Sequence, residues 1–96
     1  MNPEFEVRTT AHFDRDFRSL FRQHRELVRR YADVARILQT DPYNRTLSHP
    51  IKKLEGVSAG DGQYRIRTGR FRFRYDIEGK VVYLKTCELR REGTYR

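Results

Sequence analysis

The chain has 96 residues, of which 36% are hydrophobic, 12% aromatic and 35% charged, and its formal net charge is +8. A chain of this length holds one hydrophobic core, and its aromatic content is too high for a disordered protein. We therefore expect a single domain over residues 1–96, with no second domain and no repeat array.

The positive charge is unevenly distributed along the chain. Residues 1–50 carry 9 basic and 7 acidic side chains, whereas residues 51–96 carry 12 basic and 6 acidic ones. Of the 21 basic residues 17 are Arg, the side chain that binds phosphate with two parallel donors and stacks on bases. This excess predicts a nucleic-acid partner. The alternatives are a solubilising surface and a surface that binds an acidic protein.

Cysteine usage and hydropathy exclude several classes of protein. Cys87 is the only cysteine, so no intramolecular disulfide and no zinc-binding thiol cluster can form. No apolar run is long enough for a signal peptide or a membrane span, so we expect a cytoplasmic protein. The acidic residues of the second half are scattered over turns and strand ends, so we expect no metal and no cofactor.

The hydrophobic pattern of the first half of the sequence predicts a short strand and two helices. Residues 4–9 alternate between apolar and charged side chains, as in a strand. Apolar residues recur at helical spacing over residues 11–23 and again over residues 25–40, where Asp41-Pro42 ends the pattern. A loop over residues 42–50 follows.

The second half is dominated by an alternating stretch, residues 64–76 (YRIRTGRFRFRYD). Two strands joined at Thr68-Gly69 would place its aromatic and aliphatic residues on one face and its arginines on the other. The arginines of the polar face are Arg65, Arg67, Arg70, Arg72 and Arg74. We expect Asp76 to pair with Arg70 or Arg74. A turn at Glu78-Gly79 and a last strand over residues 80–88 complete the pattern.

These elements predict an α+β fold in the order β-α-α-β-β-β. The N-terminal helical hairpin would pack on one face of a mainly antiparallel sheet of about four strands. The opposite face would then present guanidinium groups to solvent. Because RNA carries its own nucleophile, the 2′-hydroxyl, such a metal-free face is better suited to cleaving RNA than DNA.

Four segments in this order resemble the RelE/ParE superfamily of toxins from bacterial and archaeal toxin–antitoxin pairs. They are residues 51–56 (IKKLEG), 64–75 (YRIRTGRFRFRY), 81–84 (VVYL) and 89–96 (LRREGTYR). The resemblance extends over nearly the whole chain and implies a RelE-like fold. In that superfamily the RelE-like branch cleaves messenger RNA, typically in the ribosomal A site, without metal and by 2′-hydroxyl attack.

The same resemblance implies the site residues. Arg72 would bind the scissile phosphate, and Arg91 would stabilise or protonate the leaving oxygen. Tyr95 would orient or deprotonate the 2′-hydroxyl, or stack on the base. Arg67 stands where some relatives have lysine; because arginine hardly deprotonates, we expect it to act as an electrostatic clamp. The further candidate RNA-binding residues are Lys52, Lys53, Arg65, Arg70, Arg74, Tyr83, Lys85 and Arg90.

Two other functions stay open at this point. A ParE-like toxin would inhibit DNA gyrase by protein contact, and a basic binding module would hold nucleic acid or a partner without any chemistry. The resemblance implies a cognate antitoxin as partner, and the net charge of +8 predicts that its binding segment is acidic. For the nuclease, messenger RNA and the ribosome are the further expected partners.

Overall fold

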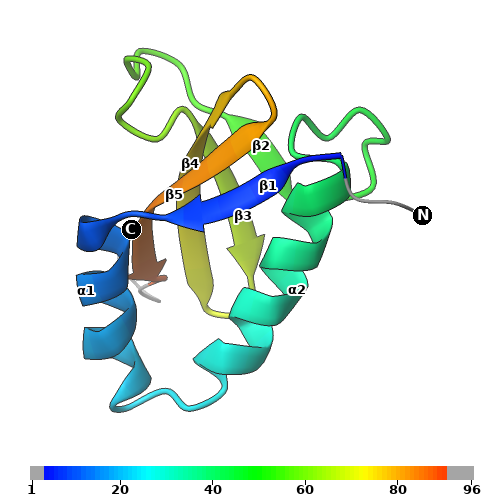
Figure 1. Ribbon diagram of the computed structural model, residues 1–96. Coiled ribbons are helices and arrows are strands. Elements are labelled where there is room, and N and C mark those ends of the chain that lie inside the picture. The colour runs from blue at the N-terminus through cyan, green and yellow to red at the C-terminus, as the bar shows by residue number, and fades with distance from the viewer. Residues whose placement is uncertain (1–3, 91–96) are drawn as a thin grey trace, which may run out of the picture.

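Two helices lie on one side of a twisted sheet in the computed structural model, which describes residues 4–90 (Figure 1). The helices are α1 (Ala11–Phe21) and α2 (Leu27–Thr40). The strands are β1 (Glu6–Thr9), β2 (Ile51–Lys53), β3 (Tyr64–Thr68), β4 (Phe71–Glu78) and β5 (Val81–Leu89). The predicted α+β class and the predicted helical hairpin are confirmed, with helix ends that differ by no more than two residues.

The described residues form a sheet in the order β1-β5-β4-β3-β2. β1 runs parallel to β5 and the other pairs are antiparallel, so the sheet is mainly antiparallel as predicted. The strand count differs: the sheet has five strands where about four were expected, because residues 51–53 add β2 at one edge. Three residues are too few to show an alternating pattern, which is why the sequence did not reveal this strand.

Both helices bury an apolar stripe against the sheet. Thr10 caps α1 by accepting the N–H of Phe13, and its hydroxyl donates to the carbonyl of Leu84 at 2.9 Å, which ties the helix start to β5. The residues that meet in the core are Phe13, Leu27, Val34 and Leu38 from the helices and Ile66, Phe71, Phe73, Tyr75, Val82, Leu84 and Cys87 from the sheet. The phenol of Tyr75 donates to the carbonyl of Pro42 at 2.7 Å, so the loop after α2 is joined to this core.

A register shift in the β4–β5 ladder keeps the two faces of the sheet consistent. Arg74 pairs with Thr86 and Tyr75 with Leu84, so Lys85 is an extra residue on β5. This bulge lets apolar residues of β5 face the core on both sides of it. The polar face therefore continues across β2, β3, β4 and β5 without interruption.

The loop between β2 and β3 is held against β4 by a buried carboxylate. Asp76, only 7% exposed, accepts the backbone N–H groups of Gly62 and Gln63 at 2.8 and 3.0 Å. Among the interactions of the described residues, Asp76 makes no ion pair with Arg70 or Arg74, so that expectation is wrong. Two backbone donors satisfy the carboxylate instead.

Neither helix of the described residues, 4–90, has the length and apolar character of a membrane span.

Candidate nucleic-acid interface

The face of the sheet that points away from the helices carries basic residues in register. Lys52 of β2 pairs with Arg65 of β3, which pairs with Arg74 of β4. One row nearer the β3–β4 turn, Arg67 pairs with Arg72. Side chains of one strand alternate between faces, so these five residues point away from the buried Ile66, Phe71 and Phe73. We call the set Lys52, Arg65, Arg67, Arg72 and Arg74 the basic face.

The arrangement concentrates positive charge at a cost. Directly opposed residues of neighbouring antiparallel strands have their Cβ atoms about 5 Å apart, and like charges at this distance destabilise the pair. The Arg67–Arg72 and Arg65–Arg74 pairs both oppose like charges. Several guanidinium groups gathered on one face attract anions, so the electrostatics of this face favour a polyanionic ligand.

Two residues of β5 extend the rows, and the sequence reasoning missed both. Glu88 pairs with Arg72 and is the acidic neighbour of the basic face, while Thr86 pairs with Arg74. The hydroxyl of Thr86 is buried and has no hydrogen-bond partner among residues 4–90. Only the register across the β5 bulge brings these side chains to the basic face, and that register is not visible in the sequence.

Arg74 differs from its neighbours because its guanidinium is bound to the β2–β3 loop. Its Nε donates to the carbonyl of Gly62 at 3.1 Å and its Nη2 to that of Asp61 at 2.8 Å. A side chain committed to two backbone carbonyls has fewer donors left for a ligand. Arg74 therefore holds the loop at the margin of the basic face.

Arg70 lies away from the predicted face. It occupies the β3–β4 turn, not a strand, and its Nη2 donates to a carboxylate oxygen of Glu26 at 3.1 Å and lies 3.1 Å from Nδ1 of His24. Both partners belong to the α1–α2 junction, so the expectation that Arg70 joins the other arginines of the polar face is wrong. Strand alternation does not hold through a turn, which is the physical reason.

The remaining candidates of the described chain lie outside the centre of the basic face. Lys53 pairs with Tyr64, and its Nζ lies 5.7 Å from the centre of the Tyr64 ring. As the neighbour of Lys52 in β2, it points to the opposite face of the sheet. Tyr83 pairs with Asp76, four residues along β4 from Arg72, or roughly 13 Å in a strand. Lys85 lies over the Tyr83 ring at 5.8 Å.

The chain approaches the Arg67–Arg72 pair again at its other end. The backbone N–H of Arg90 donates to the carbonyl of Arg70, so Arg90 lies beside the β3–β4 turn. The predicted catalytic residues Arg91 and Tyr95 lie outside the described residues. Within residues 4–90, no three His, Cys, Asp or Glu side chains gather closely enough to hold a metal ion.

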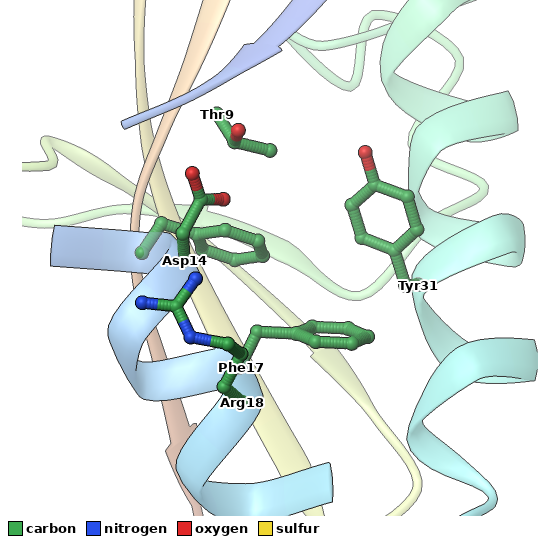
Figure 2. A pocket seen from close by; sticks show the side chains of 6 residues that line it. Thr9, Asp14, Phe17, Arg18 and Tyr31 are labelled. Atoms are coloured by element: carbon green, nitrogen blue, oxygen red, sulfur yellow. The ribbon is translucent and has the colours of Figure 1, made fainter. Parts of the chain in front are cut away.

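A separate groove lies in the helix layer, on the opposite side of the sheet from the basic face. Its volume is about 320 Å³, and Figure 2 shows Tyr31 of α2 facing Phe17 of α1 across it, with Asp14 and Arg18 at its rim. Thr9 and Phe13 complete its lining. The groove contains none of the predicted site residues, so it is not part of the candidate interface.

Comparison with known proteins identifies the fold. No family model and no curated protein matches the sequence. Among solved structures, the toxin–antitoxin complex RelBE2 from Mycobacterium tuberculosis is similar over 92% of this chain and 99% of the matched chain, with a TM-score of 0.68 and 21% identity. The archaeal RelE-RelB complex from Pyrococcus horikoshii OT3 is similar over 94% of this chain and 99% of the matched chain, with a TM-score of 0.68 and 24% identity. The chain therefore has the RelE-like fold that the sequence predicted.

Proposed function

We propose that this chain is the toxin of a type II toxin–antitoxin pair and cleaves messenger RNA on the ribosome. The observation that supports it best is the opposed Arg67–Arg72 pair, with Arg90 held at the neighbouring turn. The RelE-like fold of the two toxin–antitoxin complexes supports the same assignment. A cytoplasmic location follows from the substrate.

The proposed reaction is metal-independent attack of a 2′-hydroxyl on the adjacent phosphate. The 2′-oxygen forms a bond to phosphorus and the bond to the 5′-oxygen breaks, which leaves a cyclic phosphate and a 5′-hydroxyl. One proton leaves the attacking hydroxyl and one is taken up by the leaving oxygen. Arg72 and Arg67 stabilise the negative charge that develops on the phosphate oxygens, an effect worth about 3 kcal/mol per well-placed donor.

The remaining roles fall to the C-terminal residues. Tyr95 orients or deprotonates the 2′-hydroxyl, and Arg91 stabilises the leaving oxygen. Arginine does not exchange protons readily near neutral pH, so this set is poor in acid–base catalysts. We therefore propose that the ribosome positions the message, and that free RNA is cut slowly.

The partner that controls the activity is an antitoxin. The two similar structures named above are complexes, the toxin–antitoxin complex RelBE2 and an archaeal RelE-RelB complex. A net charge of +8 favours an antitoxin with an acidic segment that covers the basic face. Such a segment would compete with RNA for Arg65, Arg67 and Arg72.

Inducible expression followed by mapping of messenger 5′ ends tests the proposal. We expect new ends in phase with codons inside translated regions, and none with Arg72→Ala. Arg36→Ala, a change on the exposed side of α2, serves as the control and should cut like the original protein. An unchanged transcript profile together with inhibited gyrase supercoiling would favour the ParE-like function instead. RNA binding without cleavage would leave only a binding module.

A further inference from the structure

A second group of arginines surrounds the junction between α1 and α2, at the lower end of the helix layer in Figure 1. We call Arg18, Arg22, Arg25 and Arg29 the junction patch; all four are exposed. The segment from residue 17 to residue 32 contains five arginines and one acidic residue, Glu26.

The one acidic residue of this segment is bound elsewhere. Glu26 accepts a hydrogen bond from Arg70 of the β3–β4 turn at 3.1 Å. A hydrogen bond from its own backbone N–H, and then this contact with Arg70, lower the pKa of the Glu26 carboxyl. Within the described part of the chain, no acidic side chain forms an ion pair with any member of the junction patch. The patch therefore keeps its full positive charge.

Helix stability explains two of these charges, because Arg18 in the last turn of α1 and Arg22 at its C-cap suit the negative end of the helix dipole. It does not explain the arginines that follow the junction. Arg29 lies in the first turn of α2, where the positive end of the helix dipole disfavours a cation. That first turn has no acidic residue, and Glu26 at the N-cap makes no capping hydrogen bond with its side chain. Side chains that lower the stability of their own helix in this way are typical of binding surfaces.

The chemistry of the patch fits phosphate better than a protein surface. Protein interfaces need an apolar centre that loses its water, but near this junction Val28 is the one exposed large apolar side chain among the described residues. Arginine binds phosphate through two parallel donors. Arg25 is already ordered, because its guanidinium carbon lies 4.7 Å from the centre of the Phe21 ring.

We propose that the junction patch binds the phosphate backbone of duplex RNA. The inference deepens the proposed function: the basic face would hold the single-stranded message while the junction patch holds a structured RNA. The two surfaces belong to different layers of the fold. A toxin that acts inside a particle built of folded RNA would use such a second contact for docking.

The test compares two triple variants that lose the same charge. Arg22→Gln, Arg25→Gln and Arg29→Gln together remove three members of the patch. Arg8→Gln, Arg36→Gln and Arg45→Gln remove three exposed arginines elsewhere, of which Arg8 and Arg36 are paired with Glu6 and Asp33. Binding to a labelled RNA duplex of about 20 base pairs is measured by fluorescence anisotropy between roughly 50 and 300 mM KCl. Circular dichroism checks that each variant folds, and the single substitutions replace any triple variant that does not.

The affinity of the patch variant for the duplex should fall at least about tenfold at low salt. The slope of log affinity against log salt concentration should become shallower by about two to three. The control variant should change little in both respects. If both variants lose the same affinity, the loss comes from net charge alone and the proposal is overturned. Unchanged duplex binding by the patch variant would overturn it as well. If the patch variant loses binding to poly-glutamate but keeps the duplex, the surface serves an acidic protein. Because cleavage is not measured, failure here leaves the proposed nuclease activity unaffected.

Discussion

Arg67 and Arg72 are direct cross-strand partners, one pair away from the turn that joins β3 to β4. The carbonyl of Arg70 in that turn accepts the N–H of Arg90, the last described residue. One short turn thus both sets Arg67 opposite Arg72 in the ladder and binds the backbone of Arg90. Substitutions can separate what this turn contributes to stability from what the arginines contribute to function.

Replacing Arg67 by glutamine should weaken function without weakening the fold. The change removes one of two opposed like charges, so the free energy of unfolding should stay the same or rise by roughly 0.2–1 kcal/mol. Growth arrest on induction should be largely lost. Urea unfolding and colony counts measure the two effects. Arg36→Gln, which loses an exposed pair with Asp33 at 3.2 Å, should keep its toxicity. A destabilised Arg67→Gln variant would contradict the repulsion argument.

Replacing Asp76 by alanine should destabilise the protein strongly. Its carboxylate accepts two backbone N–H groups at 2.8 and 3.0 Å in a nearly buried position. Removing the acceptor leaves these donors without a partner, at a cost of about 2–4 kcal/mol. The midpoint of urea unfolding measures it. Asp33→Ala, at an exposed ion pair, should cost less than about 1 kcal/mol. Similar midpoints for the two variants would show that the loop does not depend on Asp76.

Two glycine substitutions test the contact between the β2–β3 loop and Arg74. Gly62 and Gly79 have φ values of +81° and +61°, so alanine is strained at both positions. At Gly62 the new Cβ would also lie 3.0 Å from Cβ of Arg74, whereas at Gly79 nothing lies within 4 Å. Gly62→Ala should therefore cost about 1 kcal/mol more than Gly79→Ala in thermal or urea unfolding. Equal costs would mean that the loop moves away from Arg74 freely.

The thiol of Cys87 should be unreactive in the folded protein. Burial raises the pKa of Cys87 from 9.0 to about 12, and the side chain is 3% exposed. At a pH of about 8 its thiolate fraction is then roughly a thousandfold lower than that of a free thiol. Because the raised pKa favours the neutral form in the fold, this contribution to stability is present at neutral pH and declines as the pH rises above about 9. Reaction with Ellman's reagent should need guanidinium; a rapid reaction without it would contradict the buried position.

The sequence predicted much of the fold from local patterns. The apolar spacing of residues 11–23 and 25–40 predicted both helices, and the alternation of residues 64–76 predicted which side chains face the core. Phe71, Phe73 and Tyr75 are fully buried as expected. These features depend on neighbours a few residues apart, so they can be read along the chain.

Contacts between distant segments were decided only by the tertiary structure. Arg70 and Arg74 look alike in the sequence, but one binds Glu26 at the helical junction and the other binds the β2–β3 loop. Strand register decided that Lys52, Arg65 and Arg74 form one row and that Arg67 opposes Arg72. The alternation of side chains determines the face that a residue occupies, whereas turns, bulges and packing determine its partner, because those depend on residues far away in the chain.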